Sequence, residues 1–429
     1  MKSLGRSLTP SRGRAAALAF ALIAGACATE RARGPVLPPP PQPPVRVRPV
    51  EPPPPPPPPT IENDITRNRV ALLVPMTGPQ APVGQSIANA ALLALTDLHD
   101  ARFRLTTYDT AGPGGARAAA QAAVAAHAGV ILGPLLAGHV RDAAPIASAA
   151  GVPMLSFTND AGVAGGGTYV MGFQPAQSIA RVIGFARAHG VSRFAALLPA
   201  GVYGTRASTS FLRAVQANGG TVTGIATYTR DRKQLAAAAR KVTNYQARLS
   251  RAGSGPGLLR PDGTVAPIAA RAAPVPFQAL LIADNGPIAA AFGPSLGQYG
   301  AAATKLLGTE LWAAEPGLAR VPALRGAWFA AVPDARFVRL AVRYRARYGS
   351  HPSRLASLGY DAVLLVQAAA RNWVPGEPFP RAALADAGGF SGVDGAFRFG
   401  SSGIAERSLE VRQIGAGGVA VVSPAPGAF

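Results

Sequence analysis

The sequence predicts an α/β protein built from two similar lobes, each a doubly wound parallel sheet. Short apolar runs alternate with helical stretches of about 10–15 residues, and this alternation is typical of parallel βαβ units. The alternation runs in two successive series, and the second begins near Gln174. The 369 residues that follow residue 60 are more than one hydrophobic core usually serves, so two lobes are expected.

The first series begins with the apolar run 70–74, which predicts a buried strand followed by a loop. The expected elements after this loop are helix 86–98, strand 103–108, helix 115–126, strand 130–132, helix 140–150 and strand 152–157. Loops at the carboxyl ends of parallel strands meet at one edge of a sheet. Any binding site is therefore expected at that edge.

The second series follows the same pattern and is interrupted once. Its expected elements are helix 179–189, strand 194–198, helix 205–218, strand 222–228, helix 232–249, strand 279–283, helix 287–299 and strand 304–307. Between them, residues 250–276 contain five prolines and few large apolar side chains, which predicts an exposed, poorly ordered insertion. Beyond Ala327 we expect helices over 335–348 and 353–372 and then a β-rich tail with hairpins.

The amino-terminal residues have the pattern of an export signal. Basic residues precede the apolar run 15–25, which is too short to span a bilayer. Cys27, the single cysteine, follows small residues that resemble the lipobox of bacterial lipoproteins, which predicts a signal peptide over 1–26 and a lipid on Cys27. The run Ala24-Gly25-Ala26 also fits ordinary signal cleavage, which would leave no lipid. Ala28, in place of aspartate, implies the outer membrane in such lipoproteins, so we expect a periplasmic protein anchored there.

A proline-rich linker is expected over 27–60. Between Pro35 and Pro59, 16 of 25 residues are proline, which excludes helix and sheet. A polyproline II segment of this length reaches roughly 80 Å. It would serve as a semi-rigid arm that holds residues 61–429 away from a membrane. A tether without a length requirement and a PxxP docking site are the alternatives.

The charge and the motifs exclude several classes of function. The formal net charge is +21, but the arginines are scattered, and export argues against a nucleic-acid partner. Anionic partners outside the cytoplasm, or a compositional bias toward arginine, explain the charge instead. The five histidines show no metal-binding spacing, a second cysteine is lacking, and no phosphate-binding glycine loop occurs, so no metal, cofactor or catalytic residue is predicted. Ser295 lies in a G-x-S-x-G match, but within an expected helix rather than on a strand-to-helix turn. The chain is therefore expected not to be an enzyme.

Five segments, in order, resemble type I periplasmic binding proteins of the leucine/isoleucine/valine-binding kind. They are VALLVPMTGPQAPVGQSIANAALLAL, GVILGPLLAGHVRDAAPIASAAGVPMLSF, FAALLPAGVYGTRASTSFLRAVQANGGTV, SLGYDAVLLVQAA and FSGVDGAFRF. The resemblance implies two lobes joined by three crossings, with a ligand cleft that closes by hinge motion. The lobes would comprise about 61–173 with 332–390, and about 174–331 with 391–429.

The resemblance also implies where a ligand would bind. Amino-acid binders of this family place Ser or Thr after the glycine loop, but here that loop reads Gly133-Pro134-Leu135-Leu136 and has no hydroxyl. The candidate cleft residues are Thr77, Ser156, Thr158, Asn159, Tyr203, Asp284 and Glu310. Tyr203 matches the family's tyrosine beside the ligand, and Asp284 and Glu310 follow strands whose ends line the cleft. Capping or packing roles in loops are the alternative for all of these residues.

The lipobox, the proline arm and the altered glycine loop together resemble a narrower group, the outer-membrane lipoproteins that activate penicillin-binding proteins. Its best-known members carry a helical-repeat domain before this fold, whereas here only prolines precede it. The resemblance implies a peptidoglycan synthase as partner. The competing expectation is the substrate-binding component of a transporter for branched-chain or other amino acids, with an envelope enzyme as a third class.

Overall fold

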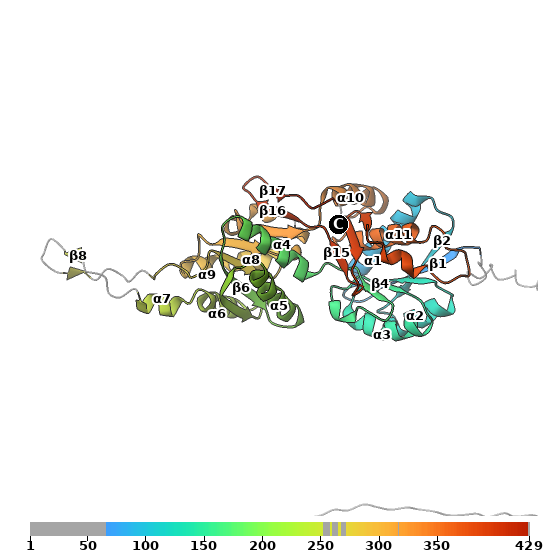
Figure 1. Cartoon of the computed structure of the whole chain (residues 1–429), viewed down its shortest axis with the longest axis horizontal. Helices are drawn as coiled ribbons and strands as arrows, with labels where there is room; N and C mark the ends of the chain where they lie inside the picture. The colour runs from blue at the N-terminus through green and yellow to red at the C-terminus, as the bar shows by residue number, and fades with distance from the viewer. Residues whose placement is uncertain (1–65, 252–257, 260–264, 267–271, 316, 428–429) are drawn as a thin grey trace, which may run out of the picture. The chain divides into compact units, whose positions relative to one another are not determined.

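The computed structural model describes residues 66–251, 258–259, 265–266, 272–315 and 317–427 (Figure 1). The predicted signal peptide, the linker with Cys27 and most of the insertion 250–276 lie outside these residues. The chain divides into Met1–Pro58 and Pro59–Phe429, and every described residue belongs to the second unit. Within the described ranges, every helix is too short or too polar to cross a bilayer.

The first sheet has five parallel strands in the order β2-β1-β3-β4-β5. The strands are β1 (Asn68–Val74), β2 (Phe103–Asp109), β3 (Val130–Leu132), β4 (Met154–Ser156) and β5 (Thr168–Val170). The helices of this lobe are α1 (Ala81–Leu98), α2 (Gly115–Ala125), α3 (Ala137–Ala149), α10 (Ala335–Tyr348) and α11 (Ala356–Ala369).

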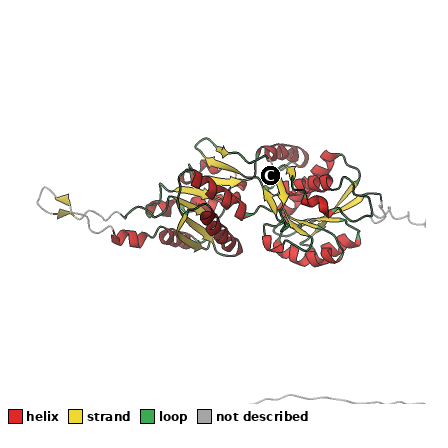
Figure 2. Cartoon of the chain, in the orientation of Figure 1, coloured by secondary structure: helices red, strands yellow, loops and turns green. Residues whose placement is uncertain are grey.

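Both faces of the first sheet are buried, as its continuous apolar strands predict. Successive side chains of a strand point to opposite faces. Val70, Leu72 and Val74 accordingly pack against α1 and α11. Ala71 and Leu73 pack in a second cluster with α2 and α3. Helices therefore cover both faces of the sheet (Figure 2).

The second sheet has seven strands in the order β17-β16-β12-β11-β10-β6-β7. The parallel strands are β6 (Arg193–Pro199), β7 (Thr221–Tyr228), β10 (Ala279–Ile282), β11 (Lys305–Gly308) and β12 (Trp328–Ala331). The antiparallel pair β16 (Glu410–Ile414) and β17 (Val419–Ser423) extends the β12 edge. The helices are α4 (Pro175–Ala188), α5 (Val202–Ala217), α6 (Arg232–Val242), α7 (Tyr245–Arg251), α8 (Gly286–Ala291) and α9 (Gly293–Gln298). Helices α4 and α5 cover one face, and α6, α8 and α9 cover the other.

Smaller elements complete the chain. A three-stranded antiparallel sheet is formed by β13 (Phe390–Gly392), β14 (Gly395–Phe399) and β15 (Ala405–Arg407). The short pair β8 (Leu258–Leu259) and β9 (Val265–Ala266) belongs to the insertion. The 3₁₀ turns are η2 (Ala161–Val163), η3 (Glu310–Ala314), η4 (Leu318–Arg320), η5 (Pro322–Leu324) and η6 (Arg381–Ala385).

The predicted fold class is confirmed: two parallel-sheet lobes are joined by three chain crossings. The chain crosses between β5 and α4, between β12 and α10, and between β15 and β16. One lobe boundary differs from the expected 390/391. Val393, Phe397, Phe399 and Ala405 belong to the core of the first lobe, so the third crossing follows β15.

Two expected helices are each split in the structure. The predicted helix 232–249 is interrupted at Asn244, whose φ of 50° lies in the left-handed region that ends helices. The predicted helix 287–299 becomes α8 and α9, and a proline occupies the first turn of α9. The strands β5 and β12 were not expected, because such short runs carry little periodicity.

Candidate functional site

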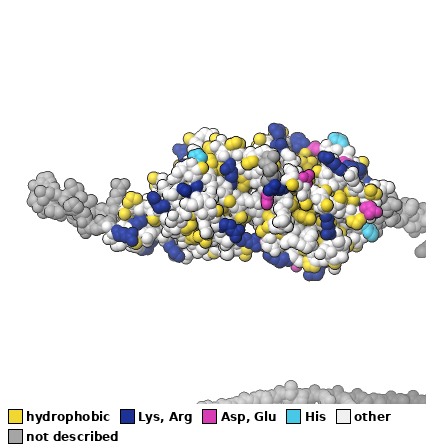
Figure 3. Space-filling view, viewed as in Figure 1, with side chains coloured by type: hydrophobic (Ala, Val, Ile, Leu, Met, Phe, Trp, Pro, Cys, Tyr) yellow, Lys and Arg dark blue, Asp and Glu magenta, His cyan; other side chains and the backbone are white. Residues whose placement is uncertain are grey.

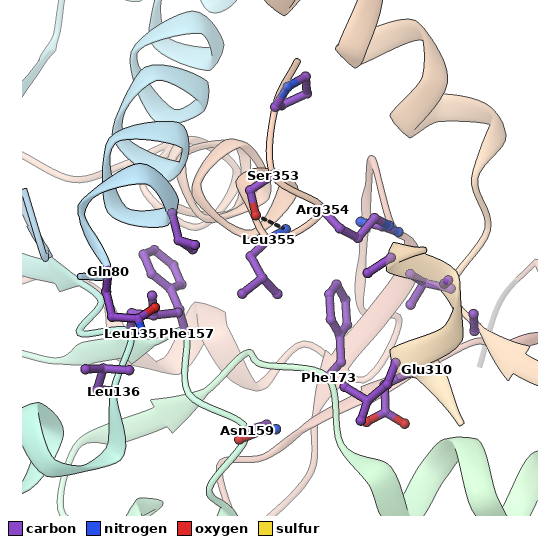
Figure 4. A pocket seen from close by; sticks show the side chains of 17 residues that line it. Gln80, Leu135, Leu136, Phe157, Asn159, Phe173, Glu310, Ser353, Arg354 and Leu355 are labelled. Carbon is purple, nitrogen blue, oxygen red and sulfur yellow. Dashed lines mark hydrogen bonds between the residues drawn. The ribbon is translucent and has the colours of Figure 1, made fainter. Parts of the chain in front are cut away.

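A cavity of about 610 Å³ lies between the two lobes, at the carboxyl ends of their strands (Figure 4). Its apolar lining consists of Val83, Leu135, Leu136, Phe157, Phe173, Leu311, Ala313, Ala314, Ala331, Val332, Pro352 and Leu355. Its polar lining consists of Gln80, Asn159, Glu310, Ser353 and Arg354. The cavity therefore lies at the sheet edges where the βαβ pattern predicts a site, and its walls are mainly apolar.

The loop after β3 brings two leucines to the cavity. A Cβ on Gly133 would come within 2.1 Å of the Leu73 carbonyl oxygen, and the φ of Gly133 is 93°. Only glycine fits there without strain, so the loop passes close to β1 and then presents Leu135 and Leu136. Leu136 remains 37% exposed at the cavity wall. The cavity therefore has apolar groups where the resemblance leads one to look for a hydroxyl.

Aromatic rings form much of the remaining wall. Phe157 follows β4, and Phe173 lies in the first crossing between the lobes. Figure 4 shows Phe157, Phe173 and Leu355 around the same space, with Glu310 at its margin. The Leu355 amide donates to Ser353 Oγ over 3.3 Å, which fixes the turn that leads into α11.

Glu310, in the first turn of η3, is the acidic group of the lining. Ser178 Oγ donates to Glu310 Oε2, and the Tyr203 hydroxyl donates to Glu310 Oε1 over 3.2 Å. Burial raises the pKa of Glu310, because removal from water penalises the charged carboxylate. Burial and the neighbouring Glu310 likewise raise the pKa of Tyr203. The carboxyl group is thus partnered within the protein and biased toward its neutral form.

Arg354 is the basic group of the lining, and neighbouring residues already hold it. Its Nη1 lies 2.8 Å from Asp394 Oδ1 and donates to Ser357 Oγ over 2.8 Å. Its guanidinium stacks on Phe337, 4.3 Å from the ring centroid. Its Nη2 has no hydrogen-bond partner among the described residues.

Two of the seven candidate residues, Asn159 and Glu310, line the cavity. Tyr203 contributes indirectly, through its hydrogen bond to Glu310. Ser156 and Thr158 are buried: Ser156 Oγ donates to the Pro134 carbonyl over 3.0 Å, and Thr158 Oγ1 accepts from the Asp160 amide. Their hydroxyls therefore hold the loops beside the cavity.

Thr77 and Asp284 also lie outside the lining. Thr77 Oγ1 donates to Asp109 Oδ2 over 2.6 Å in the loop after β1. Asp284 is fully buried. Its carboxylate accepts hydrogen bonds from Arg230 Nη2 over 2.8 Å and from Arg230 Nε over 3.1 Å. The Tyr228 hydroxyl and the Asn285 amide also donate to Asp284. Asp284 thus anchors the turn into α8.

The lining residues Phe157, Phe173 and Arg354 were not predicted from the sequence. Phe157 directly follows β4 and stands between the candidate residues Ser156 and Thr158, so its place in the sequence could have marked it. Phe173 and Arg354 lie in the first crossing and in the turn before α11, where neither periodicity nor a motif marks them.

The polar groups of the site are few and lie among apolar walls. Among residues 66–427 as far as they are described, histidines, cysteines and carboxylates form no group of three that could hold a metal ion. The lining offers apolar walls with a few amide, hydroxyl and charged groups, which is the usual composition of a small-molecule site.

The comparisons with known proteins agree with this geometry. The sequence model of a family described as "Periplasmic binding protein" matches residues 68–418. An uncharacterised protein of Rickettsia prowazekii is 29% identical over 134 residues. This match covers 31% of the chain and only about a third (36%) of the length of that relative.

Solved structures share the fold at low sequence identity. A solute-binding protein of an ABC transporter from Rhodopseudomonas palustris, in complex with 3,4-dihydroxybenzoic acid, superposes with a TM-score of 0.61 at 19% identity, covering 85% of this chain and 97% of that chain. An ABC transporter substrate-binding protein from Desulfitobacterium hafniense, in complex with leucine, gives a TM-score of 0.59 at 19% identity. This match covers 83% of this chain and 100% of that chain. The periplasmic ligand-binding protein of a branched-chain amino acid ABC transporter from Burkholderia xenovorans gives a TM-score of 0.61 at 16% identity, covering 83% of this chain and 95% of that chain.

Proposed function

This chain belongs to the periplasmic binding protein family, and we propose that it is a solute-binding protein whose cavity takes a small, mainly apolar organic molecule. The observation that carries the proposal is the cavity of about 610 Å³ at the strand ends of both lobes. Small-ligand sites typically measure about 300–1,000 Å³ and have apolar walls with a few polar groups.

The lining favours a ring or a branched aliphatic body over a strongly polar ligand. Leucine and phenylalanine side chains form its walls, and Gln80, Asn159 and Ser353 supply separate polar groups. The structurally similar proteins named above hold leucine or 3,4-dihydroxybenzoic acid, which combine a branched aliphatic chain or an aromatic ring with polar groups.

Glu310 argues against a zwitterionic amino acid held in the usual way. Both of its oxygens accept hydrogen bonds from within the protein, and burial raises its pKa. Both effects weaken Glu310 as a partner for the ammonium group of an amino acid. An aromatic or aliphatic monoacid has no ammonium group, so we expect it to bind more tightly than leucine or isoleucine.

Calorimetric titration of the full chain with benzoate, 3,4-dihydroxybenzoate, leucine and isoleucine tests the proposal. Ala314 lines the cavity and is exposed, so Ala314→Trp should fill the space without disturbing a core. We expect at least tenfold weaker binding in this variant. Ala150→Trp, an equal change at an exposed position at the end of α3, should bind as the native chain does.

Two results would contradict the proposal. One is that none of the four molecules binds the native chain. The other is that Ala314→Trp binds the best of them with unchanged affinity while the protein remains folded by circular dichroism.

Activation of a peptidoglycan synthase is the second candidate, and the 16 prolines between Pro35 and Pro59 favour it. We propose with it a lipid on Cys27 that anchors the protein to the outer membrane. An arm of roughly 80 Å would let the folded lobes reach a penicillin-binding protein on the inner membrane. A substrate-binding protein beside its permease has no need of such reach.

Two measurements separate the candidates. Mass spectrometry of the mature amino terminus should find acyl chains on Cys27; an unmodified cysteine would remove the anchor. Deleting half of residues 35–59 should abolish an activator's function in cells while the purified chain still stimulates its synthase. Normal function of the shortened chain, together with micromolar binding of a small molecule, would favour solute binding alone.

A further inference from the structure

We propose that the outward face of α10 is a docking site for an acidic, amphipathic segment of a partner protein. Helix α10 belongs to the first lobe, and its inner side packs against the core of that lobe. Leu340 and Tyr344 are buried in the core of the first lobe, and Tyr344 Oη accepts a hydrogen bond from Asn89 of α1. The opposite side carries the features that point to a partner.

Two valines form an apolar ridge on that side. Val338 is 58% exposed and Val342 is 67% exposed. They are four residues apart in the helix and so lie one above the other on one face. Single exposed apolar residues are common on protein surfaces. Two on one helical face, with a hollow on each side, form a surface onto which apolar side chains of a partner can pack.

A hollow lies on either side of this ridge, and Val342 lines both. The first, of about 570 Å³, is also lined by Arg339, Tyr360 and Leu364. The second, of about 580 Å³, is also lined by Phe337, Ala341 and Ala346. The face thus has room for apolar side chains of a partner on both sides of Val342.

The charge on α10 is of one sign. Its sequence ARFVRLAVRYRARY holds five arginines and no acidic residue. Arg343 pairs with Asp97, and Arg336 donates to Ser391 Oγ and the Gly392 carbonyl. Arg339 and Arg345 make no ion pair with the described residues. Figure 3 shows Lys and Arg side chains gathered along the edge of the molecule where α10 lies.

This combination selects the chemistry of the occupant. Arginines beside an apolar ridge complement carboxylates beside apolar anchors, and like charges across an interface are costly. A second copy of this chain would bring two basic helices together. Helices that bind lipid surfaces carry large apolar residues such as Trp, Phe and Leu on a wide face. Two valines are a small apolar surface for insertion into a bilayer, but they can contact the apolar side chains of a docked peptide.

The test selects peptides against the full chain from a displayed library of random 14-residue peptides. The enriched peptides should contain Asp or Glu together with Leu, Ile or Phe at a spacing of three or four residues. The best of them, labelled and followed by fluorescence anisotropy, should bind at least tenfold more weakly to the double variant Arg339→Glu/Val342→Asp. Its affinity should also fall as the ionic strength rises.

The matched control is Arg117→Glu/Val374→Asp, the same two changes at exposed positions of the first lobe. It should bind the peptide as the native chain does. Equal loss in both double variants, or enriched peptides without acidic residues, overturns the proposal. The proposal is also overturned if no peptide is enriched and the native chain instead binds anionic vesicles, with Arg339→Glu/Val342→Asp abolishing that binding. This result would assign the face to a lipid. Self-association of the native chain that this variant abolishes also overturns the proposal.

Discussion

At the scale of single residues, Glu310 shows how burial changes what a side chain can do. It lies at the cavity, but Ser178 and Tyr203 satisfy its oxygens, and burial raises its pKa. An acid whose pKa is raised by folding holds its proton in the folded state after the unfolded chain has released it. Its contribution to stability is therefore complete at low pH and is lost as the pH rises.

Glu310→Gln tests this electrostatic role. Glutamine keeps the size of the side chain and carries no charge. As the pH rises above the ordinary value of 4.5, the free energy of unfolding of the native chain should decline relative to that of the variant. Urea denaturation of both proteins between pH 4 and pH 8 measures the difference. Glu377→Gln, at an exposed carboxylate, is the control and should follow the native chain throughout.

The sequence anticipated the residues of the site less well than its location. Asn159 and Glu310 line the cavity, whereas Ser156 and Thr158 lie in the same loop region but turn their hydroxyls to backbone groups. Spacing places a residue after a strand but does not show which way its side chain points. Arg354 reaches the cavity through contacts with Asp394 and Phe337, which are distant in sequence, so no local pattern marks it.

At the scale of elements, two arginines bind the interlobe crossings to one another. Arg407, at the end of β15, donates from Nη2 to the Met171 carbonyl of the first crossing over 2.7 Å. Arg412, in β16, donates to the Val332 carbonyl of the second crossing over 2.6 Å. Arg412 also pairs with Asp334 and Glu410. The third crossing therefore holds the other two in place.

Arg412→Met should destabilise the protein by about 3 kcal/mol, because it leaves the buried Glu410 without its cation. Chemical denaturation measures this loss. The double variant Glu410→Gln/Arg412→Met should recover part of the stability, since it removes the unpaired charge as well. Arg213→Met, at an exposed arginine of α5, should change stability by less than about 0.5 kcal/mol. An equally small effect of Arg412→Met would show that the crossings do not depend on this arginine.

The elements themselves were largely predictable, because continuous apolar strands and amphipathic helices leave a periodic signal. The exceptions have local causes. Asn244 adopts a left-handed conformation that divides α6 from α7, although the apolar spacing continues past it. Strands β13 to β15 join the first lobe because their apolar side chains fit its core, and hydrophobicity alone does not identify which core receives them.

At the scale of the whole folded unit, the cavity draws its lining from both lobes. Leu136, Phe157 and Leu355 come from the first lobe, and Glu310, Leu311 and Ala331 come from the second. A ligand that contacts both lobes binds more tightly when the lobes are closed around it than when they are open. The ratio of these two affinities sets how far the ligand can shift the population toward the closed arrangement.

We therefore expect ligand binding to narrow the distribution of distances between the lobes. Cysteines at Arg117 of α2 and Arg213 of α5, both exposed, provide one spin-label site on each lobe in a chain carrying Cys27→Ser. With the tightest-binding molecule of the calorimetric panel at saturation, pulsed electron resonance should show a narrower distribution shifted to shorter distances. The same labels in an Ala314→Trp background should need at least tenfold more ligand for half of the same change, because this variant is expected to bind at least tenfold more weakly. A distribution that saturating ligand leaves unaltered in the native cavity would mean that the three crossings, tied through Arg407 and Arg412, hold the lobes in a single arrangement.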